Sequence, residues 1–381
     1  MTTAATDRAV TSERVSVLHL ILVLGPTNSQ FNEHCLPQMH ARSISIATYF
    51  APKLAVPGEI TLFAGDGTLR GFFRALSRSL SATDHDVVHA HGAQSGFLLM
   101  LSIAVRPSRW RYWRRTVFTV HDSWYDFRPR NKLLMLPVFA TFRRVVFCGR
   151  SAYDSAPRII KRLIGRRSRV VQNAADLGRV ERVVGGQAAR DDGQFGIVAI
   201  GRMEPVKDPL TLVEAFEQSG CVDSRLVIIG SGSLAEEVGR RVAASPCADR
   251  IELTGLIPRD EVFRRCAASD LFVSVSIGEG LPVAAMEAMG AGCPAVLSDI
   301  APHRELAEGT STPLVPCGDV GGFAEQIRRF RDMPTDTRRE AGRAANEHVR
   351  TTFSLERMHR GYEFVYSELA PAASRAEGVE L

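Results

Sequence analysis

The stretch Gly-Glu-Gly-Leu-Pro-Val-Ala-Ala-Met-Glu-Ala-Met, residues 278–289, decides the interpretation of this chain because it places two carboxylates eight residues apart across the start of a helix. Pro282 suits the first helical position, where its missing N–H is not needed, and predicts a helix that ends near Gly290. Glu279 then lies in the preceding loop. Glu287 lies on a small, apolar helix face, and a buried carboxylate without a partner costs roughly several kcal/mol. We therefore expect a partner from outside the helix, such as a ribose diol.

The alternative is that both acids have structural roles. Glu279 would then favour the positive end of the helix dipole, and Glu287 would face solvent on a surface helix. The next segment, Gly-Cys-Pro-Ala-Val-Leu-Ser-Asp at 292–299, predicts a turn and a short buried strand. This order places the start of the helix at the carboxyl edge of a parallel sheet, where ligands bind, and favours a binding site.

Length and composition predict a globular chain of two domains, because 381 residues with 45% hydrophobic content exceed one ordinary core. The longest apolar runs, 97–105 and 133–140, are too short to cross a membrane, and residues 1–11 do not resemble a signal peptide. The cysteines are widely spaced without a Cys-x-x-Cys pair, which argues against a disulfide framework or zinc ribbon and indicates a cytoplasmic protein. They are Cys35, Cys148, Cys221, Cys247, Cys266, Cys293 and Cys317.

Charge is unevenly divided along the chain. Residues 1–180 hold 25 Lys+Arg and 11 Asp+Glu, a net charge of +14, whereas the remainder has 22 − 31 = −9. The basic half is therefore expected to face an anionic surface or substrate.

The most basic segment, residues 106–115, interleaves Arg109, Arg111 and Arg114 with Trp and Tyr. This mixture suits the inner face of a membrane, although a nucleic-acid contact or an ordinary solvated loop has the same composition. Residues 133–142 are a second candidate membrane contact, but a core helix is favoured. We expect an anionic membrane partner and no nucleic acid.

Strand-like and helix-like segments alternate along the chain, which predicts an α/β fold with two parallel-sheet, Rossmann-like domains. The expected strands are 15–23, 43–48, 87–90, 117–120, 145–148, 170–171, 195–200, 225–229, 251–254, 271–275 and 295–297. The expected regions are a disordered N-terminus at 1–12, a first domain at 13–184, a linker at 185–194, a second domain at 195–349, a helix within 350–369 capped by Ser354, and a disordered tail at 370–381.

Two loops of the second half have polar patterns. The segment Gly-Arg-Met-Glu-Pro-Val-Lys-Asp-Pro at 201–209 follows a strand and places Arg202 and Lys207 at a carboxyl edge, where they would neutralise a phosphate leaving group. Two exposed cations in an ordinary loop are the alternative. The segment 230–235 fits Gly-x-Gly-x-x-Ala, the dinucleotide fingerprint, but a tight turn explains it equally well.

Histidines end two strands of the first half, in Asp-Val-Val-His-Ala-His at 86–91 and Thr-Val-His-Asp at 119–122. His121 is the strongest catalytic candidate, although a structural histidine at a strand end is common. The sequence Asp-His-Asp at 84–86 imitates a metal-binding pair but precedes its strand, so we assign no metal.

Together these segments resemble the retaining glycosyltransferases of family 4, which have the GT-B fold of two Rossmann-like domains facing each other across a cleft. Residues 279–287 resemble the Glu-x7-Glu motif, and residues 201–207 resemble the Gly-Arg-x4-Lys donor loop. His121-Asp122 matches the histidine of the cleft, and Asn-Ala-Ala-Asp at 173–176 resembles a turn before the linker.

The resemblance implies a nucleotide-diphosphate sugar donor held mainly by the second domain, without a metal or other cofactor. Arg202 and Lys207 would bind the diphosphate, Glu287 the ribose and Glu279 the sugar hydroxyls. His121 would position the sugar from the opposite domain. The implied catalytic residues are thus His121, Glu279, Arg202 and Lys207, and the implied donor-binding residues are Gly25, Arg202, Lys207, Leu256, Glu279, Gly280, Leu281, Pro282 and Glu287.

The sequence departs from the family pattern at three loops, one of which is the turn at 173–176, where Ala174 stands in place of the turn glycine. Residues 25–29, Gly-Pro-Thr-Asn-Ser, lack the usual glycine pair, which leaves Gly25 as the position expected to meet the donor. Asp208 replaces the common glycine after Lys207.

The resemblance predicts retaining transfer of a hexose-type sugar to an acceptor hydroxyl, on a small molecule or on a lipid-linked or polysaccharide precursor at the inner membrane face. The alternatives are a sugar-nucleotide epimerase or phosphorylase of the same fold, a non-catalytic nucleotide-sugar-binding partner, and a dehydrogenase. Neither the base, the sugar nor the linkage follows from the residues.

Overall fold

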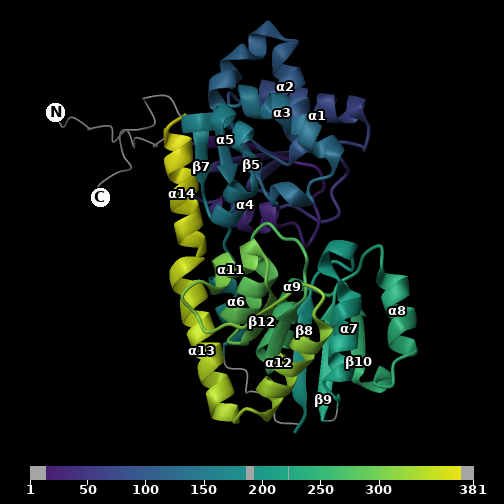
Figure 1. Cartoon of the computed structure of the whole chain (residues 1–381). Coiled ribbons are helices and arrows are strands. Elements are labelled where there is room, and N and C mark those ends of the chain that lie inside the picture. The colour runs from purple at the N-terminus through teal and green to yellow at the C-terminus, as the bar shows by residue number, and fades with distance from the viewer. Residues whose placement is uncertain (1–13, 186–192, 222, 370–381) are drawn as a thin grey trace, which may run out of the picture.

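A computed structural model of the chain describes residues 14–185, 193–221 and 223–369. Two parallel sheets lie in separate lobes, one built by each half of the chain (Figure 1). The termini expected to be disordered, most of the expected linker at 185–194 and residue 222 lie outside the described residues.

The first sheet has the order β3-β2-β1-β4-β5-β6-β7. Every pair of neighbouring strands is parallel. Its strands are β1 (Ser16–Ile21), β2 (Ser43–Thr48), β3 (Ile60–Phe63), β4 (Val87–His91), β5 (Thr116–Val120), β6 (Arg144–Phe147) and β7 (Ser168–Val170). The pattern did not predict β3, because this short edge strand has only two buried residues, Ile60 and Phe63.

The second sheet has the order β10-β9-β8-β11-β12-β13 and is also parallel. Its strands are β8 (Phe195–Ile200), β9 (Ser224–Ile229), β10 (Ile251–Gly255), β11 (Leu271–Ser274), β12 (Ala295–Ser298) and β13 (Leu314–Val315). The two-residue strand β13 is too short to give a periodic signal. The prediction of two parallel-sheet α/β units is confirmed.

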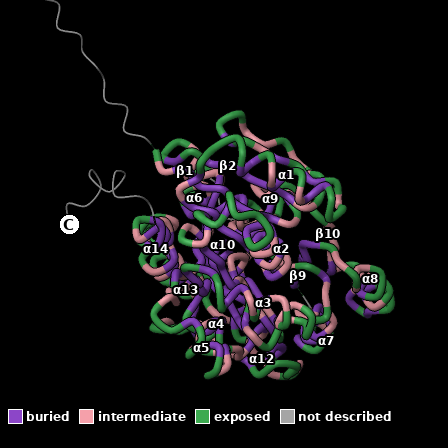
Figure 2. Tube along the Cα trace, turned by 90° about the horizontal axis from the view of Figure 1, so that it is seen from above, coloured by how far each residue is buried: buried purple, intermediate pink, exposed green. Residues whose placement is uncertain are grey.

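Helices connect the strands and cover the sheets. They are α1 (Leu69–Ala82), α2 (Ala93–Ala104), α3 (Pro129–Thr141), α4 (Arg150–Ser155), α5 (Arg158–Ile164), α6 (Leu177–Val184), α7 (Pro209–Gln218), α8 (Ala235–Ala243), α9 (Arg259–Ala267), α10 (Val283–Gly290), α11 (Ala301–Ala307), α12 (Val320–Asp332), α13 (Thr335–Thr352) and α14 (Leu355–Ser367). Buried positions concentrate in the middle of the molecule, and exposed ones lie on outer helices such as α8 (Figure 2).

The last two helices run along one side of both lobes (Figure 1). Helix α13 packs against α10 of the second lobe. Helix α14 begins at Ser354, whose side chain accepts a hydrogen bond from the Arg357 N–H, and packs against the first sheet through Met358, Tyr362 and Val365. An ion pair between Arg144 and Glu368, 2.9 Å long, strengthens this contact beyond the end of α14. The C-terminal helices thus join the two lobes.

Two findings concern expectations from composition. Within the described parts of the chain, no helix combines the length and apolar character needed to cross a bilayer.

The structure pairs Cys221 with Cys247 in a disulfide whose Cα atoms are 6.5 Å apart, which corrects the expectation that the cysteines stay unpaired. These residues precede β9 and β10, which are neighbours in the sheet, so the fold brings together cysteines that are 26 residues apart in sequence.

Candidate active site

In each sheet, the order in which successive strands are added reverses beside the first strand of that sheet. Strand β1 lies between β2 and β4, and β8 lies between β9 and β11. In open parallel sheets the loops after two such strands form a crevice at the carboxyl edge, where ligands bind. The loop at 201–207 follows β8 and the loop at 275–282 follows β11, so topology brings the two most informative segments of the second half together.

The side chains of Lys207 and Glu279 form an ion pair between these loops. Their side chains are only 21% and 14% exposed, and Ser276 donates a hydrogen bond of 3.0 Å to the same Glu279 carboxylate oxygen. The backbone supports the pairing, because the Ile277 N–H donates to the Val206 carbonyl at 2.9 Å. Arg202 is exposed at the rim. The site therefore has one fixed cation and one cation open to a ligand.

The first lobe meets this loop at the end of β5. A Cβ atom on Gly280 would lie 1.7 Å from the carbonyl oxygen of His121, so only glycine permits the observed approach. The Ser123 hydroxyl donates to the Glu279 carbonyl oxygen at 3.0 Å. His121 is partly exposed at this junction, and burial of its ring lowers its pKa to about 4. The structure thus places His121 and Glu279 on opposite sides of one junction between the lobes.

Two further carboxylates, Asp122 and Asp126, belong to this junction. Loss of solvation, with Glu279 nearby, raises the pKa of Asp122, and the opposing cations Arg202 and Lys207 lower it. Loss of solvation, then Asp122 and Glu279, raises the pKa of Asp126 to about 6. Sequence reasoning missed Asp126. Its only signal was its position four residues after Asp122 in the loop following a strand.

Glu287 is buried, which excludes the alternative in which Glu287 faces solvent on a surface helix. The partner of Glu287 comes from outside its helix, as predicted. It is Arg259, the first residue of α9, whose Nε donates to the Glu287 carboxylate at 3.0 Å. The same guanidinium donates to Glu33 of the first lobe. Glu33 Oε2 is buried and has no hydrogen-bond partner, and desolvation raises the pKa of Glu33 to about 8. Arg259 and Glu33, neither predicted, therefore tie Glu287 to the first lobe.

The remaining predicted donor contacts differ in their surroundings. Leu281 is buried and Pro282 precedes α10 as its N-cap, so both define the start of the helix. Leu256 is 70% exposed after β10, and a Cβ atom on Gly25 after β1 would meet nothing within 4 Å. Leu256 and Gly25 therefore border open space.

The Gly-rich turn at 230–235 owes its glycines to packing. A Cβ atom on Gly230 would lie 1.8 Å from the Gly201 carbonyl oxygen, and one on Gly232 would lie 2.4 Å from that of Met203. Both glycines therefore support the loop at 201–207, which agrees with the tight-turn interpretation.

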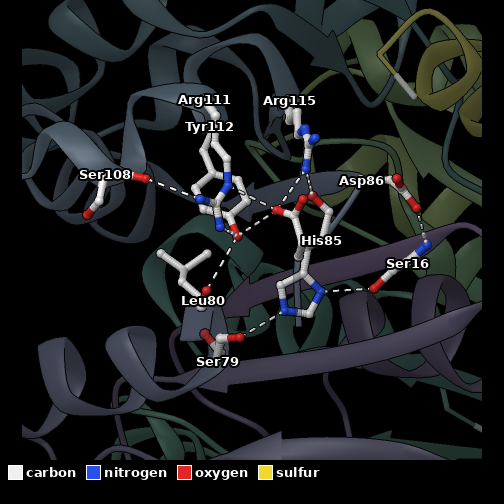
Figure 3. Close-up of polar contacts among 10 residues, drawn as sticks. Ser16, Ser79, Leu80, His85, Asp86, Ser108, Arg111, Tyr112 and Arg115 are labelled. Carbon is white, nitrogen blue, oxygen red and sulfur yellow. Dashed lines mark hydrogen bonds and ion pairs between the residues drawn. The ribbon is translucent and has the colours of Figure 1, made fainter. Parts of the chain in front are cut away.

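The acidic sequence at 84–86 is engaged in structural contacts (Figure 3). Asp84 pairs with Arg111 and Arg115 at 3.0 Å each. The His85 ring is bonded to the Ser16 hydroxyl at 3.0 Å, and Asp86 accepts from the Ser16 N–H at 2.9 Å. Asp84 and Asp86 thus have separate structural partners.

The same contacts correct part of the expectation for residues 106–115. Arg109 is buried, and its guanidinium donates to the Ser77 hydroxyl at 2.8 Å. Arg111 is partly neutralised by Asp84. Of the arginines at 109, 111 and 114, only Arg114 is exposed without an acidic partner among the described residues. Residues 133–142 largely form α3, which packs Met135, Val138 and Phe139 into the core, as favoured, and leaves Leu133 exposed.

The fold and the paired charges at the crevice define a glycosyltransferase with the GT-B fold. Residues 52–179 match the family model described as glycosyltransferase family 4, and residues 194–332 match the one described as glycosyl transferases group 1. One match lies in each lobe. The chain belongs to glycosyltransferase family 4.

Relatives with assigned activities support the family. The UDP-Gal:alpha-D-GlcNAc-diphosphoundecaprenol alpha-1,3-galactosyltransferase of Escherichia coli is 24% identical over 316 residues, which cover 76% of each chain. The amylovoran biosynthesis glycosyltransferase AmsK of Erwinia amylovora is 30% identical over 185 residues, 46% of this chain and 45% of AmsK.

Solved structures support the fold alone. Sucrose-phosphate synthase from Thermosynechococcus elongatus superposes with a TM-score of 0.76 at 16% identity, over 93% of this chain and 99% of that chain. HepE of Anabaena, solved in complex with UDP and glucose, superposes with a TM-score of 0.72 at 16% identity. The match covers 93% of this chain and 100% of HepE.

Proposed function

We propose that this glycosyltransferase moves a hexose from a nucleotide-diphosphate sugar to an acceptor hydroxyl with retention of the anomeric configuration. The observation that carries the proposal is the crevice in which Arg202 and the Lys207–Glu279 pair oppose His121. The galactosyltransferase of Escherichia coli uses UDP-galactose according to its name, and HepE was solved in complex with UDP and glucose. UDP-hexoses are therefore the first donors to test.

Each residue has a role that follows from its charge and position. Arg202 and Lys207 neutralise the diphosphate as the bond to the sugar breaks, and charge stabilisation of this kind is usually the largest catalytic contribution. Glu279 accepts hydrogen bonds from the sugar hydroxyls, and His121 contacts the sugar from the other lobe. The start of α10, with the amides of Gly280 and Leu281, adds N–H groups for the anionic or sugar oxygens.

Glu287 binds the ribose diol in this proposal. Arg259 donates to its carboxylate in the structure. Since one carboxylate accepts several hydrogen bonds, the ribose hydroxyls either share Glu287 with Arg259 or displace it. Arg259 keeps its hydrogen bond to Glu33 in both cases.

The leaving phosphate takes up the proton of the acceptor hydroxyl as the new glycosidic bond forms on the same face. Both charges of the leaving group meet protein cations, so we expect transfer without a divalent metal. Full activity after removal of metal with EDTA supports this expectation, and restoration of activity only by added Mg²⁺ or Mn²⁺ contradicts it.

The acceptor is proposed to be a lipid-linked or polysaccharide precursor presented at a membrane. The galactosyltransferase of Escherichia coli acts on a diphosphoundecaprenol-linked sugar according to its name. In this chain the neighbouring helices α3 and α5 expose apolar side chains: Leu133 is 67% exposed and Ile159 is 74% exposed. Exposed arginines of the same segments are Arg130, Arg158, Arg162 and Arg166. This α3–α5 surface replaces residues 106–115 as the main candidate contact with anionic lipid.

Vesicle binding tests the α3–α5 surface. The substitutions Arg158→Glu and Arg162→Glu together should weaken binding to anionic vesicles at least 30-fold, because each basic residue near the membrane contributes about 1 kcal/mol. Arg240→Glu on α8 is the control, because Arg240 belongs to an exposed ion pair in the other lobe. If the unmodified protein binds neither anionic nor neutral vesicles, the membrane proposal is wrong.

A donor panel read by release of free nucleoside diphosphate tests the reaction. We expect release that requires both one nucleotide hexose and an acceptor sugar or lipid-linked sugar, and that Lys207→Ala abolishes. Nucleotide sugar consumed without any acceptor would instead indicate an epimerase or hydrolase. Donor binding without turnover under any condition would contradict the proposal.

A further inference from the structure

Histidine rings form a hydrogen-bonded chain that leads from the interior of the first lobe to the crevice. His19 Nδ1 lies 2.9 Å from His91 Nε2, and His91 Nδ1 lies 2.9 Å from His121 Nε2. The three rings belong to β1, the end of β4 and the residue after β5, which are adjacent strands of the sheet. Successive rings stack, with centroids 5.2 Å apart in both pairs. Both nitrogens of His91 are therefore committed to neighbouring histidines.

We infer that His91 is a positioning residue that sets the tautomer of His121, so that His121 presents an Nδ1–H donor to the donor sugar. His121 Nδ1 has no hydrogen-bond partner among the residues that the structure describes, and the residue is partly exposed at the junction of the lobes. This inference rests on the proposed contact between His121 and the sugar.

The chain allows two proton arrangements when its rings are neutral. Burial lowers the pKa of His91 well below its ordinary value, that of His121 to about 4 and that of His19 to about 3, so each ring carries one N–H at neutral pH. If His91 carries its proton on Nδ1, His121 must accept at Nε2 and carry its own proton on Nδ1. If His91 carries its proton on Nε2, His121 must donate from Nε2 and present a bare Nδ1 to the crevice.

Arg42 at the inner end of the chain selects the first arrangement. His19 Nε2 has no hydrogen-bond partner within the described residues, and His19 lines a small cavity with Arg42, His34 and His359. Arg42 is a permanent cation with donors only, and its charge contributes to the low pKa of His19. Because this positive charge acts on His19 from the same cavity, a lone pair at Nε2 is favoured over an N–H there. His19 therefore carries its proton on Nδ1 and donates towards His91.

Two other polar residues of the cavity, Gln38 and His359, are bonded to each other. The Arg42 Nε–H donates to Gln38, whose amide lies 2.7 Å from His359 Nδ1. His359 must then accept at Nδ1 and donate from Nε2 to the Glu33 carbonyl oxygen at 2.7 Å. His359 is thus neutral in this network. Arg42 is the one cation among the residues that line the cavity, and its guanidinium also contacts the exposed Glu363 at 3.4 Å.

A metal ion is the competing explanation for these rings. His19, His89 and His91 offer nitrogens within 4.8 Å of one another. His89, however, bonds to the Tyr366 hydroxyl through Nδ1 and to the Thr119 hydroxyl through Nε2, at 2.7 Å each. With both His91 nitrogens also paired, hydrogen bonds account for the cluster without an ion.

Ring nitrogen resonances of selectively ¹⁵N-histidine-labelled protein test the tautomer directly. Long-range ¹H–¹⁵N correlations distinguish a protonated nitrogen from one with a lone pair, and His121→Gln assigns the signal. We expect His121 to be protonated at Nδ1 in the free protein. The neutral substitution Arg42→Gln should shift His121 towards the Nε2–H form, whereas Arg42→Lys, which keeps the charge, should not.

Activity provides the second measurement. His91→Phe removes both bonds of the chain while it keeps a flat ring, and should lower kcat/KM for the donor about tenfold, as expected for one misdirected hydrogen bond. An Nε2–H tautomer in the unmodified protein, equal spectra for Arg42→Gln and Arg42→Lys, stoichiometric Zn²⁺ on the rings, or unchanged turnover of His91→Phe would each overturn the inference. If the tautomers respond as expected but no donor is turned over, the proposed function fails and the tautomer relay stands.

Discussion

Gly280 of the second lobe lies against the carbonyl oxygen of His121 in the first lobe, with no room for a side chain between them. A Cβ atom at this position would approach the oxygen to 1.7 Å. The contact joins the loop that carries Glu279 to the strand end that carries His121. The two loops can approach this closely only because residue 280 is glycine, since the methyl group of alanine would not fit between them.

The substitution Gly280→Ala should therefore move the two loops apart. We expect a loss of about 100-fold in kcat/KM, because a displacement of about 1 Å between catalytic groups has this effect. Gly239→Ala is the control: Gly239 lies within α8, and a Cβ atom there meets nothing within 4 Å. Full activity of Gly280→Ala with an unchanged melting temperature would show that the contact is not required.

Lys207 and Glu279 should act as a unit. Lys207→Ala and Glu279→Ala are each expected to lower donor turnover at least 100-fold, as loss of one charge-stabilising group does in other enzymes. Because the two side chains form an ion pair, the double variant should lose less than the product of the single losses. Steady-state kinetics on the four proteins measure this, with Arg240→Ala as a surface control. Independent, multiplicative losses would contradict a shared role.

Glu33 should make stability depend on pH. Its pKa of about 8 in the folded chain exceeds the ordinary value of 4.5, so the folded state holds a proton that the unfolded chain releases at lower pH. The free energy of unfolding then falls as pH rises from about 4.5 to 8.

Glu33→Gln keeps the neutral form at every pH and should flatten this decline. Melting temperatures measured from pH 5 to 9 test it, and the variant should resemble the unmodified protein near pH 5 and exceed it at pH 9. Glu236→Gln, at a side chain that is 87% exposed, is the control. An unchanged slope for Glu33→Gln would mean that Glu33 is ionised throughout.

Asp208 adopts a left-handed backbone conformation, with φ of 47° and ψ of 49°, where the family commonly has glycine. Its carboxylate accepts a hydrogen bond from the Thr211 hydroxyl at 2.7 Å. Asp208→Gly and Asp208→Ala both lose this bond, but only alanine keeps a Cβ in the strained region, so the alanine variant should be less stable than the glycine variant by about 1 kcal/mol. Urea denaturation measures the difference. Equal stabilities would show that this residue carries no backbone strain.

Local patterns in the sequence determined which segments form strands and helices and which loops carry charge. Apolar runs predicted the central strands, because these are buried on both faces, and the residue order around Pro282 predicted α10 to within one residue. Ser354 similarly identified the start of α14. The edge strands β3 and β13 were not predicted, because few of their residues are buried.

Tertiary structure alone decided which charges meet. Lys207 and Glu279 are 72 residues apart, and Arg259 and Glu33 are 226 apart, yet both pairs are in contact because sheet order and the packing of the two lobes bring their loops together. From the sequence, a ribose diol was the suggested hydrogen-bond partner of Glu287, because no neighbouring residue of its helix could donate a hydrogen bond to the carboxylate. Burial of polar groups is a property of the folded whole, so the partners of Glu287, the Cys221–Cys247 disulfide and the histidine chain behind His121 became visible only in three dimensions.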